Sequence, residues 1–226
     1  MTELKILGID EAGKGPVCGP LVICGYMIDE KNLEKLQKEG AKDSKMLTDE
    51  KRRKLKPVLE KMARDIALLS VSAKEIDSLR SISNLNKIEI ERMQQIINLL
   101  SPDKAIIDAI EANTSKFHKK IESGLKIDCE LITENFADKN YPVVGAASII
   151  AKVHRDSAIE KLHEKFGYFG TGYCSDERTI NFLKNWIKKN KEFPDFVRKS
   201  WITIAEIKAE KEQKKMGEYL GYKSKI

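Results

Sequence analysis

Asp10 and Glu11 stand side by side at the end of a short apolar stretch, directly before the glycine-rich residues 13–15. Carboxylate oxygens are the ligands that Mg²⁺ and Mn²⁺ prefer. Adjacent side chains of a strand point to opposite faces, so the two carboxylates can share one ion only if the backbone bends just after Asp10. Glycines permit such a bend, and their exposed N–H groups can bind phosphate oxygens. The segment therefore predicts a metal site beside a phosphate site.

A nucleotide-binding P-loop is a competing interpretation, because Gly8, Gly13 and Lys14 match most of that motif. The P-loop requires Ser or Thr at position 15, where this chain has glycine, and a helix afterwards, where residues 17–28 indicate a strand. Two carboxylates inside the loop would also repel the phosphates. An acidic strand end with a tight turn remains the plain alternative, since carboxylates and glycines are common in loops.

Two further carboxylates occupy comparable places in the sequence. Asp108 ends the short apolar stretch 104–108, and Asp138 precedes a long helical pattern over residues 143–165. If the strands that end at Asp10 and Asp108 are neighbours, their ends converge at one edge of the sheet. Carboxylates without His or Cys suit Mg²⁺ or Mn²⁺ rather than zinc. Two such ions about 4 Å apart can activate a water and stabilise the leaving oxygen in phosphodiester hydrolysis.

The apolar periodicity predicts an α/β domain with a mixed sheet and helices on its faces. Strands are expected at residues 5–10, 17–28, 66–71, 104–108 and 129–133. Helices are expected at residues 31–39, 51–64, 84–100 and 143–165, and after a glycine-rich loop at 170–176. Thr48 and Asn84 are candidate N-caps, and Pro57 implies a kink or a second helix start. Residues 134–140 are expected to form a polar connection.

The composition indicates a soluble protein of one large domain, or of one domain with a small appendage. The 226 residues are 41% hydrophobic and 34% charged, and no apolar run approaches the ~20 residues of a membrane span. The N-terminus does not resemble a signal peptide. The four cysteines lack zinc spacing and are expected to be reduced thiols in the cytoplasm.

The positive charge is concentrated near the C-terminus. Residues 184–226 carry 12 Lys and Arg against 6 Asp and Glu, whereas the preceding residues carry 29 of each. A basic arm on a neutral body predicts a polyanionic partner. A solvated lysine-rich helix would have the same composition.

Six blocks occur in the order found in type 2 ribonuclease H, and the sequence resembles archaeal members from about residue 5 to about residue 205. The blocks are Gly-Ile-Asp-Glu-Ala-Gly-Lys-Gly-Pro, Lys-Asp-Ser-Lys-Met-Leu, Ile-Ile-Asp-Ala, Asp-Lys-Asn-Tyr-Pro-Val-Val, Ala-Ala-Ser-Ile-Ile-Ala-Lys-Val-His-Arg-Asp and Gly-Thr-Gly-Tyr-Cys-Ser-Asp. The resemblance implies an RNase H-like fold with a five-stranded mixed sheet flanked by helices. It further implies a catalytic domain over residues 1–170 and a helical, basic substrate-binding extension over 171–226.

The activity that this resemblance implies is metal-dependent hydrolysis of the RNA strand in RNA–DNA hybrids. It includes cleavage 5′ to single ribonucleotides embedded in duplex DNA, with 5′-phosphate and 3′-hydroxyl products. The expected setting is ribonucleotide excision and primer removal by a cytoplasmic monomer that uses two Mg²⁺ or Mn²⁺ ions and does not bind membranes. A hybrid-binding adaptor that does not cut, and a dimeric junction resolvase, are the alternatives from other functional classes.

By position within these blocks, the resemblance assigns metal binding to four carboxylates and substrate binding to six other residues. The metal-binding residues are Asp10, Glu11, Asp108 and Asp138. The substrate-binding residues are Gly13, Lys14, Gly15, Ser44, Lys45 and Tyr173. The family has Arg where this chain has Lys14, and Lys lacks the planar fork of Arg. Cys174 stands where archaeal relatives often have Pro. The 2′-OH distinguishes RNA from DNA, so the turn and Tyr173 are candidates for its recognition.

The long helix, the histidines and the C-terminal segment give three other expectations. Lys152 and Arg155 are candidates for phosphate contact on the long helix, and the three histidines are expected to be surface or packing residues. Residues 213–220 have the Gln-x-x-apolar-x-x-aromatic-apolar spacing of a sliding-clamp-binding peptide. A terminal amphipathic helix that packs back on the domain is the alternative for this last segment.

Overall fold

The computed structural model describes residues 3–41 and 47–219, with the side chains of residues 214–219 excepted. Two compact units share the chain. The sheet unit contains residues 1–14, 21–71 and 83–157, and the helical unit contains residues 15–20, 72–82 and 158–226. The functional boundary expected at residue 170 stays a prediction, and the two compact units follow other bounds.

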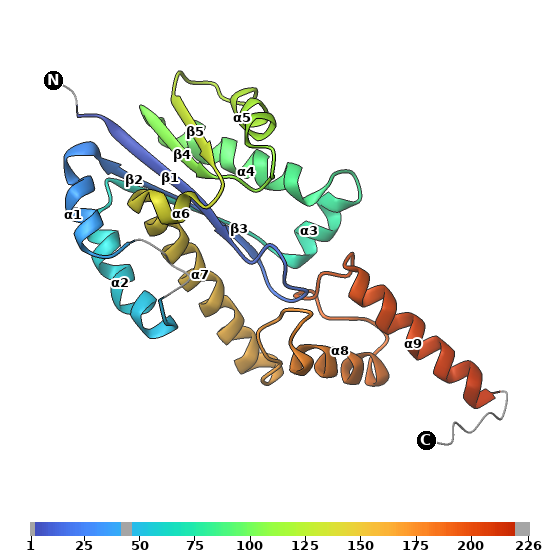
Figure 1. Ribbon diagram of the computed structural model, residues 1–226. Helices are drawn as coiled ribbons and strands as arrows, with labels where there is room; N and C mark the ends of the chain where they lie inside the picture. Colours follow the sequence, from blue (N-terminus) through green and yellow to red (C-terminus); the bar gives the residue numbers. More distant parts are fainter. Residues whose placement is uncertain (1–2, 42–46, 220–226) are drawn as a thin grey trace. The chain divides into compact units, whose positions relative to one another are not determined.

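A five-stranded mixed sheet forms the centre of the sheet unit, as predicted (Figure 1). The strands are β1 Lys5–Ala12, β2 Leu21–Asp29, β3 Asp65–Val71, β4 Lys104–Asp108 and β5 Glu130–Glu134, in the spatial order β3-β2-β1-β4-β5. Antiparallel pairing joins β1 to β2 and β2 to β3. Parallel pairing joins β1 to β4 and β4 to β5. The predicted neighbourhood of the first and fourth strands is therefore confirmed.

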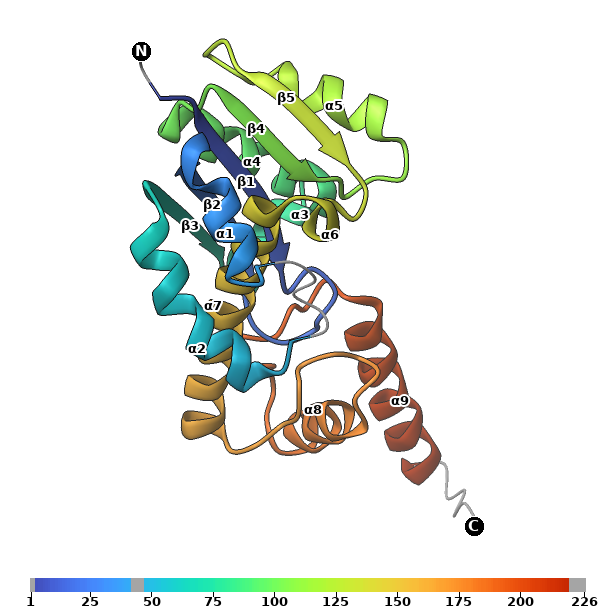
Figure 2. The same ribbon diagram turned by 60° about the vertical axis from the view of Figure 1, so that its left-hand side comes forward.

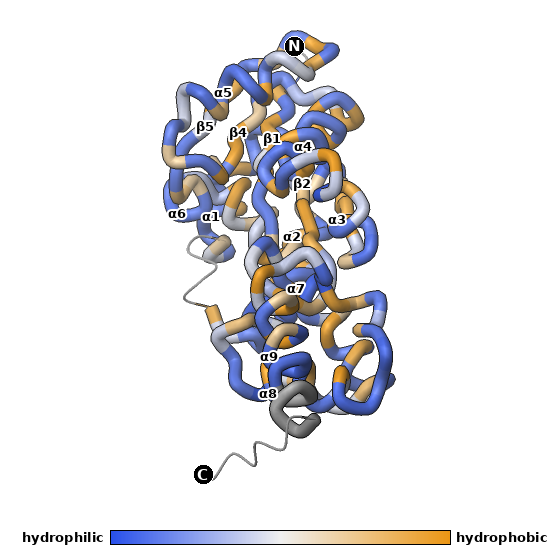
Figure 3. The backbone as a smooth tube through the Cα atoms, turned by 90° about the vertical axis from the view of Figure 1, so that its right-hand side faces the viewer, coloured by the Kyte–Doolittle hydropathy of each residue, from blue (hydrophilic) through white to orange (hydrophobic). Residues whose placement is uncertain are grey.

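Helices cover both faces of this sheet (Figure 2). On one face, α1 Leu33–Lys38, α2 Asp49–Met62 and the first part of α7 Pro142–Phe166 share a buried cluster with β1 and β2. On the other face lie α4 Leu85–Leu100 and α5 Thr114–Glu122. Strands β2 and β4 are largely hydrophobic, as expected for strands with both faces covered (Figure 3).

Capping residues fix the helix starts that the sequence predicts. The Asn84 side chain accepts a hydrogen bond of 2.9 Å from the Lys87 N–H at the start of α4. Thr48 caps α2 in the same way. Pro57 lies on the exposed side of α2, where water can hydrate the carbonyl that loses its N–H partner. Helix α2 is continuous through Pro57, so of the two expected alternatives, a kink or a second helix start, the second start is wrong.

The strand predicted over residues 17–28 begins only at Leu21. Pro20 lacks the N–H that a strand needs, and residues 15–20 belong to the helical unit. The sequence analysis also missed α3 Ala73–Arg80 and α5, and the four residues of α6 Ala137–Asn140 lie within the predicted polar connection. A 3₁₀ turn precedes α1, which shortens the helix expected at residues 31–39.

The helical unit is built around buried aromatic and aliphatic side chains. Its helices are α3, the last part of α7, α8 Glu177–Lys189 and α9 Ile202–Tyr219. The buried cluster includes Val17, Phe169, Leu183, Phe193 and Ile204. Within the described part of the chain, no helix combines the length and the apolar character needed to cross a membrane.

Candidate active site

Asp10 and Asp108 lie on adjacent strands of the sheet unit, Asp108 at the end of β4 and Asp10 two residues before the end of β1. Strands β1 and β4 run parallel, and their last paired residues are Ile9 and Ile107. Each carboxylate is the next residue on its strand, so the predicted convergence of the two strand ends is confirmed. The Asp108 carboxylate accepts a hydrogen bond of 3.1 Å from the Ala137 N–H at the start of α6.

Helix α7 provides polar partners for Asp10. The Asp10 carboxylate, only 5% exposed, accepts hydrogen bonds from the Ser148 side chain and from the Glu11 N–H. The Lys152 ammonium donates to the Ser148 hydroxyl at 2.5 Å. Burial raises the pKa of Asp10 to about 6; the Lys152 charge opposes this shift and the Asp108 charge adds to it. The uncharged carboxyl is therefore favoured at Asp10 only below about pH 6, and a bound cation would favour the charged form.

Glu11 faces the other side of the sheet, toward α4. The bend considered just after Asp10 does not occur, because β1 continues to Ala12 and stays paired with β2. Burial, followed by the charges of Asp10 and Glu89, raises the pKa of Glu11 well above its usual value. The Glu11 Oε2 atom is buried and accepts no hydrogen bond from the described residues.

Glu89 is a fifth carboxylate, which the sequence analysis did not single out. Its side chain is completely buried on α4, and its Oε2 lies 2.6 Å from the Lys14 ammonium. Leu85 and Met93 are four residues away on either side, so Glu89 interrupts an apolar stripe. A charged residue on such a stripe is the sequence signal that could have identified it.

Asp138 lies in α6 and is completely buried. Residue 137, immediately before it, donates its N–H to Asp108, which ties α6 to the end of β4. The described His, Cys, Asp and Glu side chains include no group of three arranged to hold one metal ion. The donor chemistry nevertheless fits Mg²⁺ or Mn²⁺, because the donors are hard oxygens. Burial, and after it the charges of neighbouring carboxylates, raises the pKa values of Asp10 and Glu11, and a cation would compensate both effects.

The predicted substrate residues Gly15 and Tyr173 lie together in the helical unit. Gly13 turns the chain after β1 with a φ of 87°, a conformation that favours glycine. A Cβ atom at Gly15 would lie 3.7 Å from Cε1 of the Tyr173 ring. The Tyr173 side chain is 39% exposed. An exposed aromatic ring beside bare backbone can receive a sugar or a base.

Asp176 holds the loop that carries Tyr173, a role that the sequence analysis missed. Its carboxylate accepts hydrogen bonds from the Thr171 N–H at 2.8 Å and the Thr171 hydroxyl at 3.0 Å. It also caps α8 by accepting from the Arg178 N–H. The Arg178 side chain, followed by the Thr171 N–H, holds the pKa of Asp176 well below its usual range. The loop is therefore ordered before substrate arrives.

Several other predicted residues have different surroundings or are not described. Ser44, Lys45 and Leu220 lie outside the described residues, as do the side chains of Met216 and Tyr219. Arg155 is buried and donates to Asp156 at 3.0 Å.

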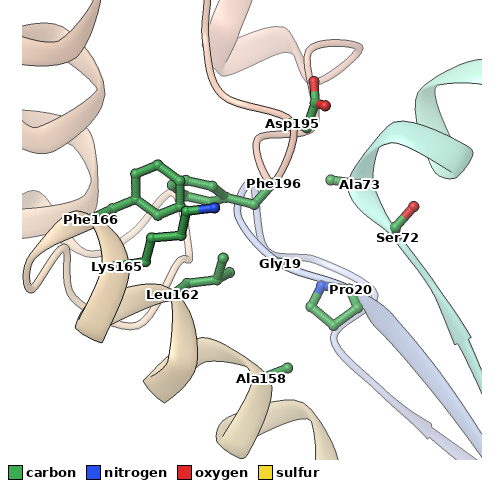
Figure 4. A pocket seen from close by; sticks show the side chains of 10 residues that line it. All are labelled: Gly19, Pro20, Ser72, Ala73, Ala158, Leu162, Lys165, Phe166, Asp195 and Phe196. Atoms are coloured by element: carbon green, nitrogen blue, oxygen red, sulfur yellow. The ribbon is translucent and has the colours of Figure 1, made fainter.

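A pocket of about 410 Å³ in the helical unit contains none of the predicted site residues. Its lining is mostly apolar and includes Pro20, Leu162, Phe166 and Phe196 (Figure 4).

His163 packs beside Phe169 and bonds to the Gly170 carbonyl, as expected for a packing histidine.

Known proteins share this sequence and architecture. A family model described as ribonuclease HII matches residues 7–204. The chain is 44% identical to a ribonuclease HII of Pyrococcus furiosus over 94% of this chain and 95% of the relative. The crystal structure of a ribonuclease H2 from Pyrococcus horikoshii matches with a TM-score of 0.88 at 42% identity, covering 93% of this chain and 100% of the other. A structure of a PCNA:RNase HII complex from Archaeoglobus fulgidus contains a chain that matches with a TM-score of 0.81 at 40% identity, covering 88% and 95%.

Proposed function

The chain belongs to the ribonuclease HII family and is an endoribonuclease of RNA–DNA hybrids with an RNase H-like fold, and from this premise we propose that it also cleaves duplex DNA 5′ to a single embedded ribonucleotide. The products are a 5′-phosphate and a 3′-hydroxyl. The proximity of Gly15 to the Tyr173 ring supports this substrate, because reading one 2′-OH requires polar and aromatic groups around one sugar.

Asp10, Glu11, Asp108 and Asp138 would hold Mg²⁺ or Mn²⁺. The observation that carries this assignment is the placement of Asp10 and Asp108 directly after the last paired residues of two adjacent parallel strands. Bound ions would activate the attacking water and stabilise the leaving oxygen. Ser148 and Lys152 orient the Asp10 carboxylate through their hydrogen bonds.

The turn at residues 13–15 contacts the substrate mainly through its backbone. The Lys14 ammonium is engaged by the buried Glu89 carboxylate, so its charge is directed into the sheet unit. Backbone N–H groups of the turn remain suited to phosphate oxygens. Ser44 and Lys45 contribute further phosphate contacts in this proposal.

A sliding clamp is the proposed protein partner, bound through residues 213–220. The spacing of this segment and the relative found in a PCNA:RNase HII complex support it. The proposed setting is ribonucleotide excision and primer removal in the cytoplasm, with the enzyme acting as a monomer. The basic residues 184–226 supply charge for the nucleic acid, and residues 171–226 act as the substrate-binding extension.

A cleavage assay tests the proposal. Wild type, Asp10→Asn and the exposed control Asp128→Asn are incubated with Mg²⁺ or Mn²⁺ on a DNA duplex with one ribonucleotide, an all-DNA duplex and a full hybrid. Wild type and the control should cut the hybrid, and should cut 5′ to the single ribonucleotide, whereas Asp10→Asn should lose both activities. Cutting of the hybrid alone would reject the single-ribonucleotide activity. Binding without cutting under either metal would favour the adaptor, and equal cutting of the all-DNA duplex, without preference for ribose, would favour a resolvase.

A further inference from the structure

Backbone carbonyls at alternate positions of residues 15–20 accept hydrogen bonds from one short stretch of the chain. The Gly15 carbonyl accepts from the Trp201 indole N–H at 3.2 Å. The Val17 and Gly19 carbonyls accept from the Arg198 N–H at 2.8 Å and from the Arg198 Nε at 3.1 Å. Residues 198–201 therefore bind residues 15–20 through three of their backbone carbonyls.

The loop that carries Tyr173 also bonds to residues 15–20. The Gly172 carbonyl accepts hydrogen bonds from the N–H groups of Val17 and Cys18, at 2.8 and 3.1 Å. Gly15 lies beside the Tyr173 ring, as described above. The position of Gly15 relative to Tyr173 therefore depends on the loop on one side and on Trp201 on the other.

Several contacts fix the Trp201 ring itself. The guanidinium carbons of Arg80 and Arg198 lie 4.7 and 4.8 Å from the ring centroid, within the range of cation–π attraction. The N–H groups of residues 199 and 200 both donate to the Asp77 carboxylate, at 2.7 and 2.9 Å. Residues of α3 and of the segment around Trp201 therefore fix the position of the indole ring. Simple filling of space would not need these specific contacts.

We propose that Trp201 is a positioning residue for ribonucleotide recognition. Its indole N–H fixes the Gly15 carbonyl and so keeps the bare edge of Gly15 beside the Tyr173 ring, where the ribose is received. This inference rests on the proposed function, because it assigns Trp201 to the recognition of the single ribonucleotide. It predicts that loss of one N–H weakens selective binding of ribose while the chemistry is preserved.

The chain offers a matched control for this test. Its other tryptophan, Trp186, is also half-buried in the helical unit and also donates its indole N–H to a backbone carbonyl, that of Glu192, at 2.9 Å. Trp186→Phe and Trp201→Phe therefore remove the same kind of hydrogen bond and keep an aromatic ring. The difference between the effects of the two variants on substrate binding therefore reports on the hydrogen bond between Trp201 and Gly15.

The first experiment measures kcat and KM for both variants on a duplex with one ribonucleotide. A typical hydrogen bond contributes about 1 kcal/mol, so Trp201→Phe should raise KM about threefold to tenfold with kcat within about twofold of wild type. Trp186→Phe should leave both constants unchanged. Equal effects of the two variants, or an effect of Trp201→Phe on kcat alone, would overturn the proposal.

A binding measurement without divalent cations separates this inference from the proposed function. Fluorescence anisotropy compares the affinities for duplexes with and without the ribonucleotide, and Trp201→Phe should reduce the ratio of these affinities by the same threefold to tenfold. If wild type fails to cut single ribonucleotides yet binds them selectively, the proposed function fails while this ratio still tests Trp201. A ratio that is unchanged in Trp201→Phe rejects the inference alone.

A spectroscopic readout covers the case in which Trp201→Phe does not fold. Trp186→Phe leaves Trp201 as the sole tryptophan, so its emission reports on the surroundings of Gly15. Addition of the ribonucleotide-containing duplex should shift or quench this emission more than addition of the all-DNA duplex. Identical emission with both duplexes would contradict a role for Trp201 in recognition.

Discussion

The Lys14 ammonium lies 2.6 Å from the Glu89 carboxylate; the Glu89 side chain is completely buried, whereas the Lys14 side chain is 33% exposed. The pair joins the turn after β1 to α4, and its two members differ in their access to water. Removal of either member should therefore have unequal consequences. A lysine that loses its partner can turn toward solvent, but a buried carboxylate cannot.

We predict that Lys14→Met destabilises the protein more than Glu89→Gln does. Loss of the ammonium beside a buried carboxylate should cost about 3 kcal/mol, and Glu89→Gln about 1 kcal/mol. Denaturant unfolding at pH 7 measures both. The double variant Lys14→Met/Glu89→Leu should recover most of the loss, since apolar pairs often replace buried ion pairs without cost. Equal destabilisation by the two single variants would contradict this asymmetry.

The raised pKa of Asp10 predicts a pH-dependent stability of the metal-free protein. Below its unfolded pKa of 3.8, Asp10 is protonated in both states. As the pH rises from about 4 to about 6, the unfolded chain loses this proton while the folded protein retains it, so stability falls. A pKa of about 6 in the folded state corresponds to a loss of about 3 kcal/mol, complete above that pH.

Asp10→Asn removes this titration and should therefore stabilise the metal-free protein at pH 7 but hardly at pH 4. Urea unfolding in the presence of EDTA at the two pH values measures the difference. Addition of Mg²⁺ or Mn²⁺ should stabilise wild type and have little effect on Asp10→Asn, because binding to the folded state alone raises its stability. A metal effect of equal size in both proteins would argue against Asp10 as a ligand.

The sequence predicted every strand except β2 to within two residues at each end, because short apolar stretches are local patterns. The adjacency of Asp10 and Asp108 needed only the pairing of β1 with β4. The contact of Trp201 with Gly15 spans 186 residues, and that of Lys14 with Glu89 spans 75. No local periodicity encodes contacts of this kind.

The missed elements have similarly physical reasons. Val17 and Cys18 are apolar and extend the predicted strand, but the backbone of residues 17–19 bonds to residues 172 and 196–198 rather than to the sheet. Helix α3 is short and polar, and its start depends on a capping box between Ser72 and Glu75. The sequence singles out Asp138 by its place before the long helix, but its own helix was missed because the four residues of α6 give no periodic signal.

The close approach of β1 to α7 yields a further prediction. A Cβ atom on Gly8 would lie 2.4 Å from the backbone carbonyl atoms of Val143, at the start of the helix that supplies Ser148. Gly8→Ala should therefore destabilise the protein by about 3 kcal/mol and reduce cleavage by displacing α7. Thermal unfolding and the hybrid-cleavage rate measure the two effects.

Gly25→Ala provides the contrast for this prediction. A Cβ atom on Gly25 would meet a side-chain atom, Cγ2 of Ile96. Ile96→Ala should therefore partly rescue Gly25→Ala, whereas Val143→Ala should not rescue Gly8→Ala, because the clash there involves backbone. Rescue of both, or of neither, would show that the two sites do not differ in this way.

The C-terminal segment can be removed without loss of the described packing of α9. Ile204 and Ile207 are buried, and Lys184 pairs with Glu210 at 2.6 Å, so α8 and α9 are joined before residue 212. Deletion of residues 213–226 should leave thermal stability nearly unchanged, since surface changes away from the core cost little. The deletion should abolish binding to the cognate sliding clamp, which titration calorimetry measures. A peptide of residues 213–222 should compete with the full-length protein for the clamp. Undiminished clamp binding by the deleted protein would place the clamp contact elsewhere on the chain.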